Sequence, residues 1–142
     1  VLTHDDADDV MQNVMLKAWT NIDSFQQQSL LSTWLYRIAI NESLNFIRSQ
    51  RNKAVNIDAD KQAELADRLM ADPYFDGDET AAQLQQAIAS LPDVQRTVFN
   101  LRYYDNMKYS EMSQLLDTTE GALKASYHIA VKKITEFFNQ KD

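Results

Sequence analysis

The sequence predicts an all-α protein, and three observations support this fold class. Only 2 Gly and 2 Pro occur among the 142 residues, and a β-sheet of several strands needs more turn residues than that. Apolar residues recur every three or four positions through most of the chain, which is the spacing of amphipathic helices. The charged residues are spread unevenly along the chain, which suggests that the helices form separate modules.

The uneven charge defines three segments. Residues 1–53 hold 5 basic and 6 acidic residues, residues 54–80 hold 2 and 8, and residues 81–142 hold 7 and 7. The central segment therefore carries a net −6 of the formal charge of −7. It also contains Pro73 and Gly77, as linkers often do. We predict two small helical modules, 1–53 and 81–142, joined by an acidic linker over 54–80.

The first module is expected to hold two helices, over 5–20 and 31–50, separated by a polar loop. Thr3 is the expected N-cap, and the aspartates that follow it suit the positive end of the helix dipole. The apolar stripe of the first helix consists of Met11, Val14, Met15, Ala18 and Trp19. The second helix is apolar on two sides and is therefore expected to be packed from two sides. We expect Trp19 and Trp34 in the core rather than as platforms for bases.

The second module is expected to hold four helices, and a short helix over 63–70 is expected within the linker. The four helices cover 80–90, a segment opened by Pro92, then 109–116 and 120–138. Thr119 is the expected N-cap of the last helix. A short helix, a tight polar turn and a longer helix predict a helix-turn-helix.

The last helix carries a second face besides its apolar stripe. Lys124, His128 and Lys132 recur at i, i+4 and i+8, away from the apolar residues. A DNA recognition helix needs hydrogen-bond donors on the side opposite its core. A simple solvated helix face has the same appearance. The overall pI of about 4.7 argues against DNA binding, but most of the acidity belongs to the linker.

Composition also excludes several kinds of function. The chain has no Cys and only 2 His, which excludes a disulfide scaffold, a Cys nucleophile and zinc sites built on Cys or several His. No Gly-rich phosphate loop, long apolar run or signal peptide is present. The acidic cluster after His4 is interpreted as a complement to the helix dipole rather than a metal site. We expect a cytoplasmic binding protein that is no enzyme and has no cofactor, no metal and no small-molecule substrate.

Two stretches resemble a known family. The first comprises D-A-D-D-V-M-Q-N-V-M-L-K-A-W (6–19), D-S-F (23–25) and T-W-L-Y-R-I-A-I-N (33–41). The second comprises S-L-P (90–92), Y-S-E-M (109–112) and G-A-L-K-A-S-Y-H (121–128). In this order, and with an acidic spacer between them, they resemble regions 2 and 4 of a bacterial extracytoplasmic-function (ECF) sigma factor. The resemblance implies a subunit that directs core RNA polymerase to specific promoters and initiates DNA melting.

The resemblance also implies roles for residues of the first module. The residues expected to bind the clamp of core polymerase are Asp9, Gln12, Asn13 and Leu16. Those expected at the minus-ten DNA are Lys17, Ser24, Phe25, Gln26, Gln27, Arg37 and Asn41. Lys17 matches a family position that helps to open the duplex, and Asn41 matches one that reads a base. The loop 24–32 matches the loop that captures a flipped base in the family. A flipped base requires a pocket, and a displaced strand requires nearby cations. Asn13 departs from the acidic residue usual in the family.

In the second module the resemblance implies reading of the minus-thirty-five element by the last helix. The expected contacts are Arg102, Ser110, Glu111, Thr119, Lys124, Ser126, His128 and Lys132. Ser126, Ile129 and Val131 stand where many members have Arg, so we expect weak DNA affinity of this module alone. Asp117 replaces a Gly that is common in the turn.

The family also has helices before the position of Asp6. Since the chain begins at Val1 without Met, we expect those N-terminal helices to be missing and part of the helix 31–50 to be uncovered. The expected partners are core polymerase, through its clamp and flap, promoter DNA and an anti-sigma factor. The first alternative is a stand-alone helix-turn-helix transcriptional regulator, which does not explain the first module. The second alternative is a helical module that binds only proteins, such as a sigma antagonist. Such a module would not need the helix-turn-helix.

Overall fold

The computed structural model describes residues 4–25, 31–53 and 65–140, with the backbone alone for Ser24 and residues 51–53. Every regular element within these ranges is a helix, so the predicted all-α class is confirmed. The chain divides into two compact units, Val1–Val55 and Asn56–Asp142. Among the described residues, no helix is both long and apolar enough to cross a membrane.

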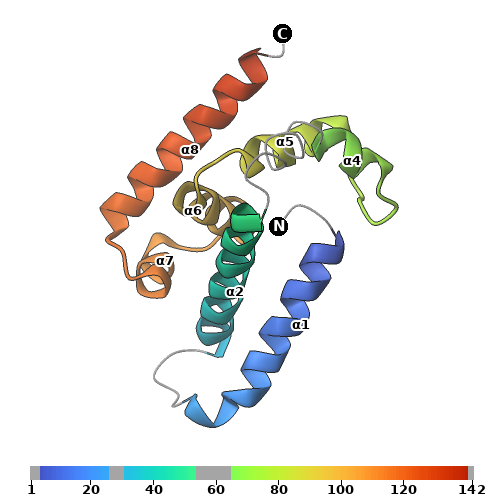
Figure 1. Ribbon diagram of the computed structural model, residues 1–142. Helices are drawn as coiled ribbons and strands as arrows, with labels where there is room; N and C mark the ends of the chain where they lie inside the picture. The colour runs from blue at the N-terminus through green and yellow to red at the C-terminus, as the bar shows by residue number, and fades with distance from the viewer. Residues whose placement is uncertain (1–3, 26–30, 54–64, 141–142) are drawn as a thin grey trace. The chain divides into compact units, whose positions relative to one another are not determined.

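Unit 1 is built on two long helices. Helix α1 (His4–Thr20) is followed by a short 3-10 helix, η1 (Ile22–Ser24), and by α2 (Leu31–Lys53). Figure 1 shows α1 and α2 side by side and antiparallel. Val10 and Val14, one turn apart on α1, are 7% and 8% exposed, and this spacing places both on one face of the helix. The predicted N-cap, Thr3, lies outside the described residues.

The end of α1 is tied down by local hydrogen bonds. The backbone N–H and the side-chain amide of Asn21 both donate to the carbonyl oxygen of Lys17, at 3.0 and 2.9 Å. The ring of Phe25 then lies 5.2 Å, centroid to centroid, from the ring of Trp34 on α2. These contacts hold the start of the polar loop against both helices.

The apolar stripe of α1 is only partly covered, and the prediction that Trp19 is a core residue is wrong. Trp19 is 80% exposed and Met15 is 65% exposed, whereas Trp34 is half-buried. The periodicity of a stripe shows that its residues share a face, but it does not show what covers that face. On α2, Leu31 is 50% exposed, and no side chain described for this helix is fully buried.

Unit 2 contains the remaining helices. They are α4 (Leu65–Ala71), α5 (Glu79–Ala89), α6 (Asp93–Tyr103), α7 (Tyr109–Leu116) and α8 (Glu120–Gln140). Asp78 caps α5, because its carboxylate accepts a hydrogen bond from the N–H of Ala81 at 2.9 Å. Pro92 lies at the N-cap of α6, one residue before the helix that it was expected to open. Helix ends defined in different ways commonly differ by this amount.

Helix α4 lies within the segment predicted as the linker and packs along α5 (Figure 1). Leu65 and Ala66 are buried, and the N–H of Ala66 donates to Oε1 of Gln86 at 3.1 Å. The short helix predicted over 63–70 is thus confirmed. Helix α4, near the second end of the predicted linker, is thus part of unit 2.

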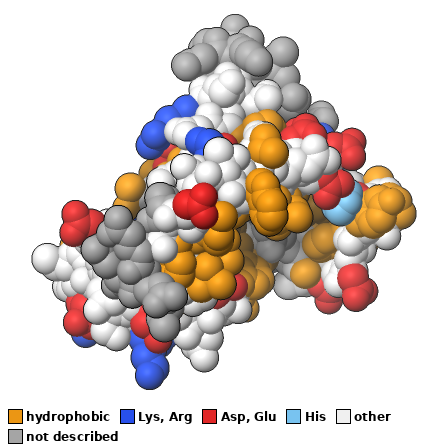
Figure 2. Space-filling view, turned by 90° about the horizontal axis from the view of Figure 1, so that it is seen from below, with side chains coloured by type: hydrophobic (Ala, Val, Ile, Leu, Met, Phe, Trp, Pro, Cys, Tyr) orange, Lys and Arg blue, Asp and Glu red, His pale blue; other side chains and the backbone are white. Residues whose placement is uncertain are grey.

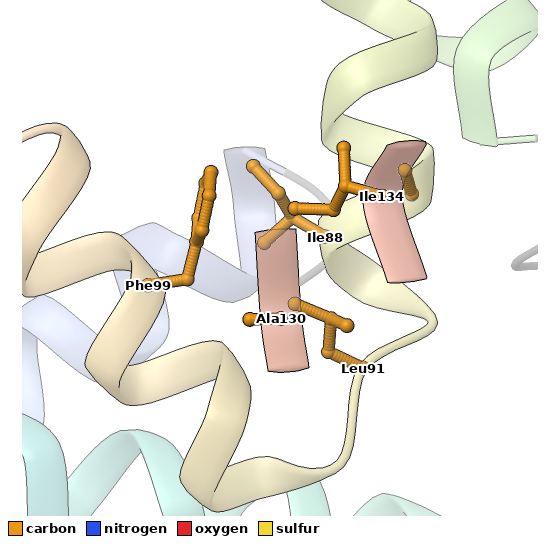
Figure 3. Packing of buried hydrophobic residues seen from close by; sticks show 6 residues of the cluster. Ile88, Leu91, Phe99, Ala130 and Ile134 are labelled. Atoms are coloured by element: carbon orange, nitrogen blue, oxygen red, sulfur yellow. The ribbon is translucent and has the colours of Figure 1, made fainter. Parts of the chain in front are cut away.

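The core of unit 2 gathers residues from α5, α6, α8 and the connection between α5 and α6. Figure 3 shows Ile88, Leu91, Phe99, Ala130 and Ile134 converging, and each is at most 8% exposed. Tyr127 of α8 stacks on Phe99 with ring centroids 5.7 Å apart. Each large apolar side chain buried in this way stabilises the fold by about 1.5–3 kcal/mol. The position of α8 is therefore set by contacts along its whole length.

The turn between α7 and α8 is ordered by capping interactions. Asp117 has φ 51° and ψ 49°, a left-handed conformation in which Gly is the usual residue. The hydroxyl of Ser113 donates to the carbonyl oxygen of Thr118 at 2.6 Å. The hydroxyl oxygen of Thr119 accepts from the N–H of Ala122 at 3.2 Å, which confirms the predicted N-cap. The helix-turn-helix thus closes without the Gly that the family often has there.

We predict that Asp117→Gly stabilises the protein by about 0.5–1 kcal/mol, because Gly adopts positive φ without a Cβ penalty. Asp117→Ala is the matched control, since it removes the same charge but keeps Cβ. Urea denaturation should show the gain for Gly and none of comparable size for Ala. Equal gains for both variants would assign the effect to the charge at the C-terminus of α7 instead.

Candidate nucleic-acid interfaces

One exposed side of α1 carries the residues predicted to bind core polymerase. Asp9, Gln12, Asn13 and Leu16 are all exposed, and their spacing of i, i+3, i+4 and i+7 places them on one face. Leu16 is 66% exposed. A large exposed apolar side chain flanked by polar ones is a suitable anchor for a protein partner.

Three of the residues predicted for the minus-ten DNA reach the surface of unit 1. Lys17, Arg37 and Asn41 are exposed, and the last two lie one turn apart on α2. Phe25 is half-buried against Trp34. The side chain of Ser24 lies outside the described part of the structure, as do Gln26 and Gln27.

Lys17 also makes a contact that the sequence did not reveal. Its Nζ lies 2.5 Å from Oε1 of Glu42 on α2, and only 11% of the Glu42 side chain is exposed. The ion pair joins α1 to α2 beside Asn41. A charge pair this close requires that the side chains of two helices meet, which no spacing within one helix indicates.

Helix α8 has the two faces that its sequence predicts. Leu123, Ala130 and Ile134 are buried, while Lys124, His128 and Lys132 are exposed. Ser126 lies at the border and is half-buried. The exposed face follows the Thr119 cap directly, so its first cation lies one turn into the helix. A helix held in this way can enter the major groove with its N-terminal turns towards the bases.

Tyr109 organises two of the predicted cations. The guanidinium carbon of Arg102 lies 4.9 Å from the centroid of the Tyr109 ring, and Nζ of Lys124 lies 5.6 Å from it. Nη1 of Arg102 also donates to the carbonyl oxygen of Met107 at 3.0 Å. Sequence reasoning missed Tyr109, because residues 102, 109 and 124 meet only in the folded unit.

The N-terminal turn of α7 carries the remaining predicted residues. Ser110 and Glu111 are exposed and follow Tyr109. The structure thus places Arg102, Tyr109 and Lys124 together, with Ser110 and Glu111 next to them in the chain. Hydrophobic side chains also reach the surface, as Figure 2 shows in orange.

Comparisons with known proteins find matches over both units. The family model "Sigma-70 region 2" matches residues 2–53, and "Sigma-70, region 4" matches residues 81–134. The chain is 33% identical over 132 residues to the ECF RNA polymerase sigma factor SigW of Bacillus subtilis. This alignment covers 87% of this chain and 70% of SigW. It is 29% identical over 133 residues to the ECF sigma-E factor of Escherichia coli, covering 84% and 67% of the two chains.

A solved structure has a similar fold. It is the co-crystal structure of the sigma factor RpoE with the anti-sigma factor NepR from Bartonella quintana. The TM-score is 0.72 at 21% identity, over 98% of this chain and 84% of the other.

The chain belongs to the ECF family of RNA polymerase sigma factors. Such a protein directs core RNA polymerase to specific promoters and initiates melting of the DNA. The predicted family and function are therefore confirmed, and core polymerase and promoter DNA are its partners.

We predict that Tyr109→Leu destabilises unit 2 by about 1 kcal/mol, because two cations lose the ring that holds them. Tyr109→Phe keeps the ring and should stay within a few tenths of a kcal/mol of the parent protein. Urea denaturation of the three proteins measures the difference. If Phe and Leu cost the same, the hydroxyl rather than the aromatic face is responsible, and the assigned role of Tyr109 is wrong.

Proposed function

We propose that the two units divide promoter recognition between them. Residues 1–53 bind core polymerase and recognise and melt the minus-ten element, residues 81–142 read the minus-thirty-five element, and 54–80 link them. The observation that carries this proposal is α8, whose buried stripe leaves Lys124, His128 and Lys132 exposed directly after a capped turn.

In unit 2 the exposed face of α8 enters the major groove of the minus-thirty-five element. Lys124, Ser126 and His128 are the proposed base and phosphate contacts nearest the helix N-terminus, and Lys132 follows on the same face. Thr119 fixes the start of the helix through its cap. Arg102, Ser110 and Glu111 support the contact from α6 and α7. Since Tyr109 fixes the side chains of Arg102 and Lys124 before DNA arrives, less of their conformational freedom is lost on binding.

In unit 1 the minus-ten element is opened and its displaced strand is bound. Lys17 and Arg37 supply donors along the strand, and Asn41 reads a base through its amide. The loop that contains Ser24, Phe25, Gln26 and Gln27 holds a base out of the stack, as enzymes that flip bases do. Because the Phe25 ring lies against Trp34, we assign Phe25 to support of this loop.

The face of α1 formed by Asp9, Gln12, Asn13 and Leu16 is the proposed surface for the clamp of core polymerase. Leu16 supplies the apolar anchor, and its polar neighbours supply the rim. Unit 2 contacts the flap of the polymerase.

Regulation and location follow from the same assignment. We infer that the protein is a binding protein without enzymatic activity, and that it acts in the cytoplasm, where its polymerase is. The fold is shared with RpoE, which was crystallised with an anti-sigma factor, and this supports an anti-sigma factor as a further partner. Isolation of the chain from its own cells should yield a complex that cannot bind core polymerase. If the chain is instead recovered free and competent for core polymerase under all growth conditions, no anti-sigma factor is needed.

We predict that variants of the two units fail at different steps. Lys124→Ala should weaken promoter binding by holoenzyme about ten-fold, because one major-groove contact is lost, while complexes already bound still melt. Holoenzyme with Asn41→Ala should bind the duplex promoter with normal affinity, but the fraction of bound promoter that melts should fall about ten-fold. Gel shifts measure binding, and permanganate reactivity of unpaired thymines measures melting, on a promoter selected with the reconstituted holoenzyme.

Lys133→Ala is the matched control for Lys124→Ala. Lys133 is exposed on the same helix but points about 180° away from Lys124 at 100° per residue. Its loss should leave promoter affinity unchanged within about two-fold. An exchange of the two phenotypes between Asn41→Ala and Lys124→Ala would show that the units are assigned to the wrong elements.

A further inference from the structure

The ion pair between Lys17 and Glu42 has unequal partners. The Lys17 side chain is 57% exposed, whereas that of Glu42 is 11% exposed, and the two atoms Nζ and Oε1 are 2.5 Å apart. An enclosed carboxylate that loses its cation pays a large desolvation penalty. Glu42 therefore keeps Lys17 when another anion approaches, and the pair stays formed.

This pairing changes what Lys17 can offer to a nucleic acid. The charges of the ammonium and the carboxylate cancel, so a phosphate approaching the pair meets little net attraction. An ammonium group has three N–H donors, and one partner does not occupy all of them. Lys17 thus retains directional hydrogen bonds while its contribution to long-range attraction is removed.

We propose that Glu42 lowers the sequence-independent affinity of unit 1 for single-stranded DNA by cancelling the charge of Lys17. This inference rests on the proposed function of Lys17 at the minus-ten strand. Non-specific binding of single strands depends on phosphate neutralisation. With one cation cancelled, binding depends more on contacts that read bases, such as that of Asn41. Glu42 is a positioning residue in this scheme, since it acts through Lys17.

The test uses the full chain, alone and in holoenzyme, with fluorescein-labelled oligo-dT and fluorescence anisotropy over a range of KCl concentrations. Glu42→Gln keeps the shape of the side chain and removes its charge. The Glu42→Gln protein should neutralise one more phosphate, which steepens the slope of log K against log salt by about 0.7. Its affinity for oligo-dT should therefore be about five-fold higher at about 0.1 M salt. An unchanged or lower affinity, with an unchanged slope, would overturn the proposal.

Two controls separate this effect from general electrostatics. In a Lys17→Met background, Glu42→Gln should leave the slope unchanged, because position 17 then has no positive charge that the loss of Glu42 could free for a phosphate. Asp5→Asn also removes one negative charge from unit 1. Asp5 lies about 18 Å from Lys17 along α1, which is beyond the Debye length of about 10 Å at 0.1 M salt. This substitution should also leave the slope unchanged. A steeper slope in either control would attribute the gain to net charge alone and contradict the proposal.

The exchanged pair, Lys17→Glu with Glu42→Lys, keeps an ion pair between α1 and α2 and should retain the parent slope. This variant tests the proposal even if Glu42→Gln fails to fold. A steeper slope for the exchanged pair would overturn the proposal. The proposed function is tested separately by promoter-dependent transcription. If the parent holoenzyme initiates correctly while no variant changes oligo-dT binding, the role of Glu42 falls and the function stands.

Discussion

The burial of one side of α8 is the constraint on which the candidate DNA interface of unit 2 depends. Leu123 is 1% exposed and Ala130 is fully buried, so rotation of this helix about its axis would expose the core. The opposite side, with Lys124 and His128, is consequently held outwards. The hydrophobic effect thus fixes the direction of polar groups that make no contact with the core.

The same principle is weaker in unit 1, where fewer side chains are fully buried. Val10 and Val14 are the buried residues of α1, and the ion pair of Lys17 with Glu42 adds a second link between its helices. The side chains that face DNA in our proposal therefore lie close to contacts that also hold the unit together. Substitutions there need tests that separate folding from binding, as the salt slope does.

The helices were predictable from the sequence because their determinants are local. Apolar spacing and caps such as Thr119 place their ends within a few residues. Trp19 was assigned wrongly, because periodicity assigns a residue to a face without showing whether that face is covered. The Tyr109 and Glu42 contacts were not predictable, since each joins side chains from different helices. Helical spacing indicated Lys124, His128 and Lys132, and resemblance to the family indicated the other site residues. The structure then showed how some of them are held.

Gel filtration of this chain with bacterial core RNA polymerase tests the central claim most directly, because every proposed DNA contact presupposes that complex. The sigma-factor function predicts that the chain elutes with core polymerase as a one-to-one complex at micromolar concentrations. Elution of the chain at its free position, with core polymerase in excess, would contradict it.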